Sequence, residues 1–324
     1  MIANWPQILD TRRLFKALQY HLYTIWLFTF SDMKTIMFPT AIWGLFNALS
    51  GPYLTTNSKP SAITILRRFP IALLWTWIVL LPFCINNQRT PDAILEDKIN
   101  KAWRPMPCQR LTPLQANRLM FTIWAGGCLI CYSMNAVVPW AMLFLLGFVY
   151  NDLGSSEHLF IRTLINGLGF QTFGWGASIV VSESRHYALN WNAALWFPVV
   201  GMVVFTTVQT QDMYDQEGDL ERGRRTLPLV VGDGPARWTT ALAVSTWSCF
   251  CPFFWGLPWG GYVVPVIVGL CVSSRTLWRR SVDADKFTFR IWCFWTLCLY
   301  VLPYTRYLAG EHDHHDLGLV GKLG

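Results

Sequence analysis

The hydrophobic residues of the chain gather in long apolar runs that are separated by polar stretches. A helix needs about 20 predominantly apolar residues to cross a bilayer, and most of the runs have roughly that length. The fourth run is the shortest and contains Pro139. The pattern predicts nine membrane spans, near residues 31–50, 67–86, 116–135, 136–151, 159–182, 193–212, 237–255, 260–277 and 288–308.

Two polar stretches, Asn86–Arg110 and Gln209–Leu227, begin at the C-terminal ends of apolar runs. If the N-terminus is cytosolic, the loops after the second, sixth and eighth spans face the cytosol and carry most of the loop arginines and lysines. This asymmetry agrees with the positive-inside rule, although Arg67 and Arg68 at the start of the second span go against it. Both polar stretches then lie on the cytosolic face, and we expect them to form one composite site.

The composition indicates a single polytopic membrane domain. Hydrophobic residues make up 53% of the 324 residues and charged residues only 14%, which is too apolar for an ordinary soluble domain. The net charge of +7 is explained by basic residues on the cytosolic side, so we expect no nucleic-acid partner. We expect an N-terminal interfacial segment at 1–30, a transmembrane domain at 31–308 and a polar tail at 309–324.

The N-terminal region has no apolar segment and cleavage site typical of a signal peptide. Residues 12–30 combine basic and aromatic side chains, which is typical of an amphipathic helix at a membrane interface. Ser31 and Asp32 follow this segment, and we expect them to cap the first span.

The cysteines and the C-terminal histidines have simple structural interpretations. The apolar runs contain Cys128, Cys131, Cys249, Cys251, Cys271, Cys293 and Cys298, which predicts buried, reduced thiols, and the CxxC pair Cys128 and Cys131 is interpreted as packing. The tract His312–Asp316 follows the last span on the opposite face, and we interpret it as a solvated tail and not as a zinc site.

The second polar stretch contains Asp212, Asp215 and Asp219 at i, i+3 and i+7, so a helix would place the three carboxylates on one face. Such a cluster repels itself unless a cation compensates it. Mg²⁺ binds through a few carboxylates together with phosphate oxygens, so the spacing predicts a site for a magnesium-bound phosphate.

The first polar stretch mixes acidic, amide and basic side chains. It suits a diphosphate clamp, in which carboxylates hold metal and basic groups neutralise a leaving group; a solvated loop with ordinary surface charge is the alternative. Arg162 and Asn166 lie one turn apart inside the fifth span. Arg162 is predicted either to contact a diphosphate or to pair with Asp152 or Glu157.

Two motifs resemble a known family. They are Asn87-Gln88, Glu96-Asp97-x-x-Asn100-Lys101-x-Trp103-Arg104-Pro105-x-Pro107-x-x-Arg110 and Asp212-x-x-Asp215-x-x-Gly218-Asp219-x-x-x-Gly223-Arg224-Arg225-Thr226-Leu227-Pro228. They look like the two aspartate-rich regions of the UbiA superfamily of intramembrane prenyl-diphosphate enzymes. The resemblance implies an all-α, polytopic bundle of about nine transmembrane helices around a central cavity, with Mg²⁺ as cofactor.

The first motif also departs from that family. Its prenyltransferases have NDxxDxxxD, whereas this chain has Gln88, Pro91 and Leu95 at the aspartate positions. The altered form is similar to the fungal UbiA-type terpene cyclases, which also share Ser31-Asp32-x-Lys34-Thr35 and Asn151-Asp152-x-Gly154 with this chain. The resemblance implies ionisation of farnesyl or geranylgeranyl diphosphate, cyclisation of the cation and release of pyrophosphate.

The resemblance and the spacing together predict three groups of site residues. The catalytic and metal-binding group is Asn87, Gln88, Glu96, Asp97, Asp212, Asp215 and Asp219, of which all except Gln88 are expected to bind metal. The diphosphate-binding group is Lys98, Asn100, Lys101, Arg104, Arg110, Arg162, Arg224 and Arg225. The group of cavity aromatics is Phe83, Tyr150, Phe170, Phe173, Trp175 and Tyr214, although interfacial enrichment of Trp and Tyr explains many aromatic residues without a catalytic role.

Two other functions are compatible with the sequence. One is a prenyltransferase that passes the same cation to an aromatic or other acceptor, and the other is a transporter or lipid-binding membrane protein without turnover. We expect membrane lipid and a prenyl diphosphate as partners, no obligatory protein partner, and a location in the endoplasmic reticulum membrane with the site facing the cytosol.

Overall fold

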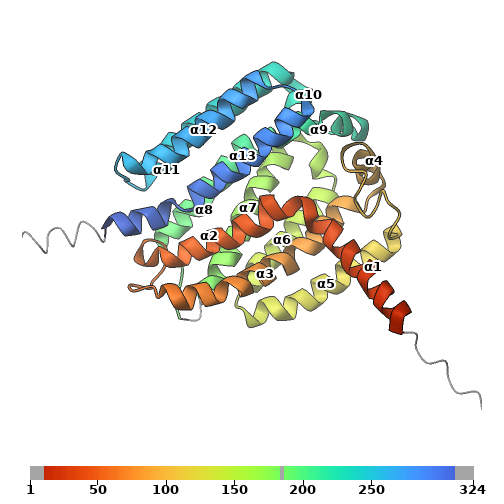
Figure 1. The fold of residues 1–324 in the computed structure, drawn as a ribbon, viewed down its shortest axis with the longest axis horizontal. Helices are drawn as coiled ribbons and strands as arrows, with labels where there is room; N and C mark the ends of the chain where they lie inside the picture. Colours follow the sequence, from red (N-terminus) through yellow and green to blue (C-terminus); the bar gives the residue numbers. More distant parts are fainter. Residues whose placement is uncertain (1–10, 183–185, 311–324) are drawn as a thin grey trace, which may run out of the picture.

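The computed structural model describes residues 11–182 and 186–310. Within these ranges the regular structure is helical apart from one isolated bridge between Thr55 and Leu189. The predicted all-α class is therefore confirmed for the described part of the chain (Figure 1). The tract His312–Asp316 lies outside the described residues.

Each predicted apolar run overlaps at least one helix. The first run contains the short η1 (Phe30–Asp32), η2 (Met33–Met37) and α2 (Phe38–Leu49). The later runs correspond to α3 (Ala62–Gln88), α5 (Pro113–Ser133), α6 (Val137–Asn151), α7 (Leu159–Val181), α8 (Trp191–Thr207), α11 (Asp233–Phe254), α12 (Gly260–Trp278) and α13 (Val282–Tyr300). The remaining helices are α1 (Thr11–Thr29), η3 (Gly51–Tyr53), α4 (Pro91–Asn100), η4 (Ser155–Glu157), α9 (Gln209–Arg222) and α10 (Leu227–Val231).

The number of helices that satisfy the requirements for a membrane span is smaller than the predicted nine. Among the described residues, α3, α12 and the helical segment Val282–Gly310 are long and apolar enough, and α8 with α9, bent by 42° at a short break, would make a fourth. The helices α2 and α6 have only 12 and 15 residues, respectively, and therefore fall short of the required length. The sequence thus predicts where the apolar helices lie, while length and composition support three or four spans.

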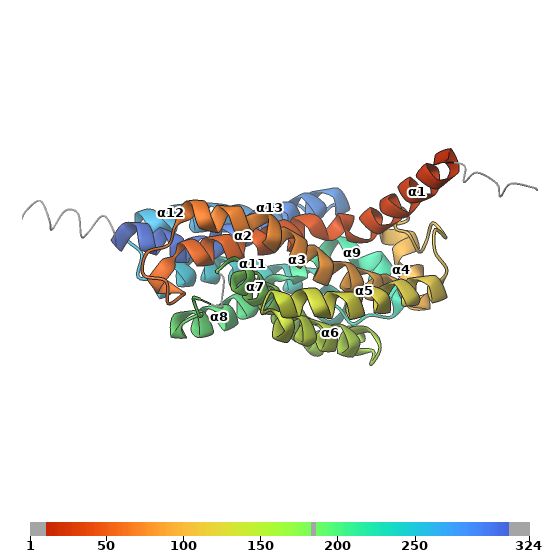
Figure 2. The ribbon, with the colours of Figure 1, turned by 90° about the horizontal axis from the view of Figure 1, so that it is seen from below.

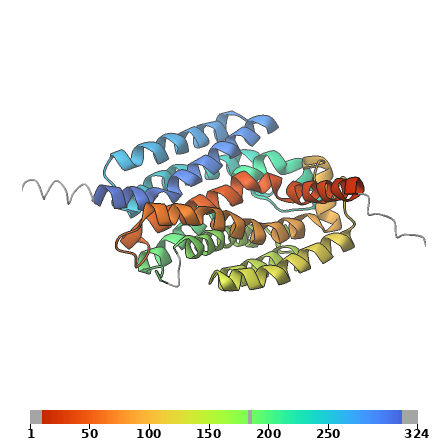
Figure 3. The same cartoon turned by 60° about the horizontal axis from the view of Figure 1, so that its bottom comes forward.

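The helices pack around two hydrophobic clusters that meet at α7. One cluster is built mainly from α3, α5 and α7, and the other mainly from α8 and α13, with smaller contributions from α11 and α12. Phe170 and Trp175 of α7 pack against both clusters. Figure 3 shows the helices running lengthwise, with α5 and α6 in yellow on one side and α12 and α13 in blue on the other.

The two polar stretches meet at one end of the bundle. Figure 2 shows α4 and α9 together at this end, where α1 also projects. All nine cysteines lie in the described residues and are free, as expected for reduced thiols. The prediction that the cysteines of the apolar runs are buried is wrong for Cys249 and Cys271, which are exposed, and Cys128 and Cys298 are only half-buried, because these helices turn part of their surface outward. The fold thereby places the chemistry-bearing side chains of two distant segments beside each other.

Candidate active site

The helix α4 presents two of its acidic side chains, Glu96 and Asp97, to the interior, whereas Asp92 in its first turn is exposed. It begins after Thr90, which has extended backbone, and Pro91 occupies its first turn, where a missing N–H group costs nothing. Glu96 and Asp97 are buried, whereas Leu95 is 45% exposed. The two acids therefore lie on the inward face of α4, and the third aspartate position of the family motif points away from it.

The helix α9 carries the three aspartates predicted to share a face. Asp212, Asp215 and Asp219 are all buried. The helix ends at Gly223, whose φ of 78° is accessible mainly to glycine, and the Arg224 amide then donates to the Asp219 carbonyl at 2.9 Å. This turn brings the Arg224 side chain back toward the aspartates.

The helices α4 and α9 approach each other closely at Gly218. A Cβ atom at this position would lie 2.3 Å from the Asn100 amide nitrogen, so any larger residue would displace the Asn100 side chain. The Asn100 side-chain amide donates to the Asp215 carbonyl at 3.2 Å, and the Lys101 ammonium lies 3.5 Å from the Asp215 carboxylate. The predicted composite site is therefore present as direct contacts between the two polar stretches.

Glu96 is held between two arginines of the second polar stretch. Its two carboxylate oxygens accept hydrogen bonds from Arg222 Nη1 and Arg224 Nη1, each at 2.9 Å. Arg224 Nη1 also donates to Asp219 Oδ1 at 3.3 Å. Burial by itself would raise the pKa of Glu96, but the guanidinium groups of Arg224 and Arg222 hold the pKa below its ordinary value.

Asp97 is held by Arg104, which lies in the loop after α4. Arg104 Nη1 donates to both Asp97 oxygens, at 2.9 and 3.1 Å, and Arg104 Nη2 donates to Ser31 Oγ at 2.9 Å. Burial raises the pKa of Asp97 above its ordinary value, although the neighbouring Arg104 charge opposes the rise. The two adjacent acids of α4 thus have pKa values shifted in opposite directions.

Arg162 pairs with Asp212 and not with the loop acids proposed for it. Its Nη1 and Nη2 donate to the two Asp212 oxygens at 2.9 and 2.7 Å. Asp152 pairs instead with Arg89. The prediction of a pairing between Arg162 and Asp152 or Glu157 is therefore wrong, because the bend between α8 and α9 turns Asp212 toward α7.

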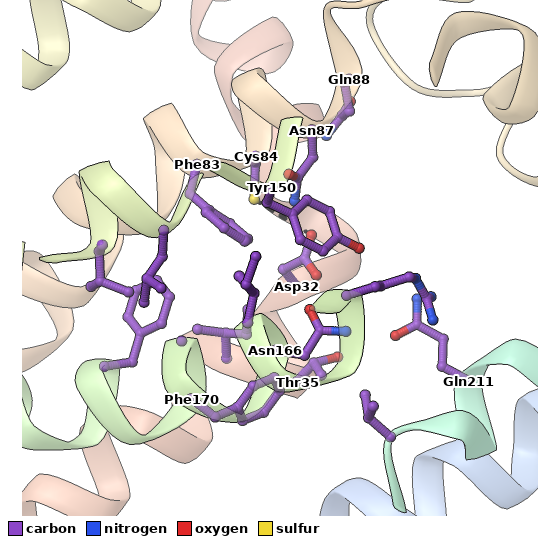
Figure 4. Close-up of a pocket in the computed structure, with 18 of the residues that line it drawn as sticks. Asp32, Thr35, Phe83, Cys84, Asn87, Gln88, Tyr150, Asn166, Phe170 and Gln211 are labelled. Carbon is purple, nitrogen blue, oxygen red and sulfur yellow. Dashed lines mark hydrogen bonds between the residues drawn. The ribbon is translucent and has the colours of Figure 1, made fainter. Parts of the chain in front are cut away.

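A cavity lies between these ion pairs and the apolar interior. Its polar wall contains Asn87, Gln88, Glu96, Asp97, Lys101, Arg104, Arg162 and Arg224. Its apolar wall contains Phe83, Leu143, Ile165, Phe170 and Phe173, with Tyr150 also lining the cavity (Figure 4). Figure 4 shows the side chains of Phe83 and Phe170 on either side of this space. One compartment thus joins a charged end to an aromatic end.

Three arginines of the cavity wall have a donor with no acceptor. The Nε atoms of Arg104, Arg162 and Arg224 are buried and have no hydrogen-bond partner. The same is true of the Nε atom of Arg222, which does not line the cavity. Buried polar groups are nearly always paired in proteins, so a cluster of unpaired cationic donors requires an explanation. An anion with several oxygens, such as a diphosphate, is the ligand that such a cluster would accept.

Several predicted site residues lie away from the cavity wall. Lys98 and Arg225 are exposed, and Arg110 binds α1 instead, where Nε donates to Thr24 Oγ1 at 2.9 Å and the guanidinium stacks on the Tyr20 ring. The residues that the structure places outside the cavity lining are Lys98, Asn100, Arg110, Trp175, Asp212, Tyr214, Asp215, Asp219 and Arg225. Of these, Asn100, Asp212, Asp215 and Asp219 belong to the surrounding hydrogen-bond network.

Tyr214 and Trp175 do not face the cavity because each is occupied elsewhere. The Tyr214 ring packs against Phe289 at 5.7 Å between centroids and lines a separate pocket. Trp175 is packed into the hydrophobic clusters around α7. Four of the six predicted aromatics therefore line the cavity.

Sequence reasoning missed several residues of the site. The expectation that Ser31 and Asp32 cap the first span is wrong, because neither η1 nor η2 has a side-chain cap. Ser31 instead accepts from Arg104, and Asp32 lines the cavity with Thr35, Cys84, Asn166 and Gln211. The motif Ser31-Asp32-x-Lys34-Thr35 was a signal for Ser31, Asp32 and Thr35, whereas Arg222 was counted only as a cytosolic charge.

The residues around the cavity have the chemistry that Mg²⁺ requires. Asn87 and Asp97 contribute oxygen donors to the wall, and Asp219 Oδ2 is a buried carboxylate oxygen without a partner. Within residues 11–182 and 186–310, no three His, Cys, Asp or Glu side chains are grouped closely enough to hold a metal by themselves. A magnesium ion here would complete its shell with water and ligand oxygens, which is the usual behaviour of Mg²⁺.

Known proteins share both the sequence and the architecture of this chain. It is 29% identical over 304 residues to the fumagillin beta-trans-bergamotene synthase of Aspergillus fumigatus, covering 89% of this chain and 94% of that protein. It is 24% identical over 306 residues to the somaliensene A/B synthase of Streptomyces somaliensis, covering 91% and 97%.

In structure, the chain resembles a UbiA homolog from Archaeoglobus fulgidus bound to DMAPP and Mg²⁺, with a TM-score of 0.59 and 10% identity, covering 88% of this chain and 99% of that one. A likeness at this identity shows a shared fold. The model of the UbiA prenyltransferase family matches residues 37–297. Since this match spans most of the sequence, the chain belongs to the UbiA prenyltransferase family.

Proposed function

We propose that the protein is a magnesium-dependent terpene cyclase of the membrane. It would ionise farnesyl or geranylgeranyl diphosphate, close the resulting carbocation into rings and release pyrophosphate. The observation that carries this proposal is one cavity that is lined both by Arg104, Arg162 and Arg224, each of which has a buried Nε without an acceptor, and by a group of aromatic side chains. A linear prenyl diphosphate has the matching division into an anionic head and an apolar tail.

The charged end of the cavity supplies the groups that hold a departing diphosphate. Arg104, Arg162 and Arg224 present buried donors without acceptors, and Lys101 adds a fourth positive charge. Charge that develops on a leaving group is stabilised most strongly by donors that are already oriented in a dry site. These residues would therefore stabilise the transition state for cleavage of the carbon–oxygen bond more than they stabilise the bound substrate.

Asn87, Asp97 and Asp219 would hold Mg²⁺, with Glu96, Asp212 and Asp215 as further predicted ligands. The ion would supply Lewis-acid stabilisation of the phosphate oxygens. In the structure Glu96 binds Arg222 and Arg224. Asp212 binds Arg162, and Asp215 binds Lys101. These arginine and lysine contacts keep the carboxylates oriented and offset their mutual repulsion.

The aromatic end of the cavity suits the cation that ionisation leaves behind. Phe83, Phe170 and Phe173 line the cavity, and Phe83 packs edge to face against Phe173 with centroids 6.2 Å apart. Ring faces attract cations, and an apolar wall excludes the water that would quench them. The shape of this wall would fold the prenyl chain for ring closure.

The altered first motif favours cyclisation over transfer to an acceptor. Gln88 is fixed by donation from its amide to the Phe28 carbonyl at 3.0 Å, and Pro91 occupies the first turn of α4. Leu95 is exposed, so none of the three aspartate positions of the family motif offers a carboxylate to the cavity. The named synthases of Aspergillus fumigatus and Streptomyces somaliensis support the same reading through sequence similarity.

The proposal is tested by incubating membranes that contain the protein with farnesyl or geranylgeranyl diphosphate and Mg²⁺, without any acceptor. A cyclic hydrocarbon detected by mass spectrometry, together with released pyrophosphate, is the expected result. Product formation only after an aromatic acceptor is added would identify a prenyltransferase instead. An absence of turnover under both conditions would favour a transporter or lipid-binding protein.

A further inference from the structure

Asp32 differs from the other carboxylates that line the cavity. Among the described residues, the cavity wall contains the carboxylates of Asp32, Glu96 and Asp97. Glu96 accepts hydrogen bonds from two arginines, and both oxygens of Asp97 accept from Arg104. Asp32 forms a longer ion pair with Arg104, with 4.0 Å between Oδ2 and Nη2 and no hydrogen bond. Within residues 11–182 and 186–310, the one hydrogen bond that its carboxylate accepts comes from the weak donor Cys84 Sγ, at 3.4 Å.

The carboxylate of Asp32 is also the most accessible of the three. The exposed fraction of its side chain is 28%, against 8% for Glu96 and 2% for Asp97. Asp32 lines this cavity, whereas its neighbours Ser31 and Met33 line a separate pocket on the other side of the segment. Asp32 therefore belongs to the wall of the compartment in which the cation would form.

The backbone at Asp32 has an unusual conformation that supports this orientation. Asp32 ends the 3₁₀ turn η1 and is followed by the π-helical turn η2. Single π turns are rare and occur frequently at functional sites. The turn directs Asp32, Thr35 and Ile36 to the cavity, and Figure 4 shows Asp32 between Tyr150 on one side and Asn166 and Thr35 on the other.

Cyclisation of a prenyl cation ends when a proton is lost. The C–H bond next to the cationic carbon breaks, its electron pair forms the new C=C bond, and a base accepts the proton. A carboxylate that is already bound by arginine is a weak proton acceptor, because its charge is neutralised by strong hydrogen bonds. A carboxylate with only a thiol donor is better suited to act as a general base.

We propose that Asp32 is the catalytic base that removes the final proton from the cyclised carbocation, an inference that rests on the proposed cyclase function. The Asp32 carboxylate becomes a carboxylic acid in this step, and it then returns the proton to an oxygen of the pyrophosphate that leaves the site. No electrons are gained or lost by the protein. The step comes after ionisation, so Asp32 controls the product and not the release of pyrophosphate.

The test uses the variant Asp32→Asn in membranes with farnesyl or geranylgeranyl diphosphate and Mg²⁺. Pyrophosphate release and each organic product are measured in the same reaction. We expect pyrophosphate release within about threefold of the wild type, while the share of wild-type hydrocarbon falls by at least about tenfold and isomeric alkenes or alcohols take its place. The product share does not depend on how much variant protein folds.

Two further variants make the result specific. Asp32→Glu keeps a carboxylate at the position and should restore part of the wild-type hydrocarbon share. Asp283→Asn makes the same chemical change at an exposed position of α13 and should leave both readouts unchanged.

Two outcomes would overturn the inference alone. An unchanged product share for Asp32→Asn would show that another group removes the proton, and a loss of pyrophosphate release would place Asp32 in the ionisation step. A wild-type protein that forms no cyclic hydrocarbon would overturn the proposed function together with the inference.

Discussion

Two buried clusters of arginine and carboxylate in the described part of the chain differ in how completely the arginines are paired. The Arg237 cluster consists of Arg237, Asp233 and Asp285 at the ends of α11 and α13. Arg237 Nε donates to both Asp233 oxygens at 2.8 and 2.9 Å, and its Nη atoms donate to Asp285 at 2.8 and 2.7 Å and to the Thr276 carbonyl at 2.9 Å. Every nitrogen of this guanidinium has an acceptor.

The cavity cluster consists of Arg104, Arg162 and Arg224 with their carboxylates Asp97, Asp212, Glu96 and Asp219. Each of these arginines has a buried Nε without an acceptor, and Asp219 has a buried oxygen without a donor. The fold can therefore satisfy a buried arginine fully, as it does at Arg237. The difference indicates that the Arg237 cluster ties helices together, whereas the cavity cluster has binding capacity left for a ligand.

The largest expected effect is on the chemistry of the cavity cluster. The double variant Asp215→Ala, Asp219→Ala removes two carboxylates predicted to support magnesium, and pyrophosphate release should fall by about 1,000-fold or more. The measurement is the initial rate of pyrophosphate release from either prenyl diphosphate with Mg²⁺. Asp283→Asn serves as the control, and a double variant within tenfold of the wild type would remove the argument for magnesium.

The next effect is on stability at the Arg237 cluster. Arg237→Met leaves the buried Asp285 unpaired and should cost about 3–5 kcal/mol of unfolding free energy. Thermal unfolding in detergent measures the loss, and pyrophosphate release per folded protein should stay within about threefold of the wild type. The double variant Arg237→Met, Asp285→Met should recover part of the stability, and a failure to do so would contradict the assignment of the loss to an unpaired charge.

Ligand binding should separate the two clusters directly. Pyrophosphate with Mg²⁺ at about 100 times its dissociation constant should stabilise the wild type by about 2.7 kcal/mol, because it binds the folded protein only. The shift should persist in Arg237→Met and disappear in Arg162→Gln. Stabilisation of Arg162→Gln equal to that of the wild type would place the anion outside the cavity cluster.

The smallest expected effect tests the geometry of the donors. Arg224→Lys keeps the charge but removes the Nε–H group and the planar fork, so pyrophosphate release should fall by about tenfold. Arg279→Lys, at an exposed position after α12, is the matched control. An Arg224→Lys variant as active as the wild type would show that charge alone is sufficient at this position.

The sequence by itself determined the positions of the apolar helices and the meeting of the two polar stretches. The hydrophobic pattern of each segment determines where a helix lies. The order of the helices along the chain then determines at which end of the bundle each helix terminates. The spacing of Asp212, Asp215 and Asp219 likewise predicted three carboxylates on α9, and all three are buried there. The resemblance to a known family then made Leu95 informative about the reaction, because Leu95 stands where the prenyltransferases of that family have an aspartate.

Only the tertiary structure decided which side chains meet. Arg162 finds Asp212 and Arg222 finds Glu96 across 50 and 126 residues, and neither partner is specified by local sequence. Arg110 belongs to the same motif as Arg104, yet it binds α1 and not the cavity. From the sequence, Asp32 was predicted to cap the first span. In the structure it is followed by a π turn, and its carboxylate lines the cavity. Such pairings depend on helix packing and bends, which long-range contacts determine.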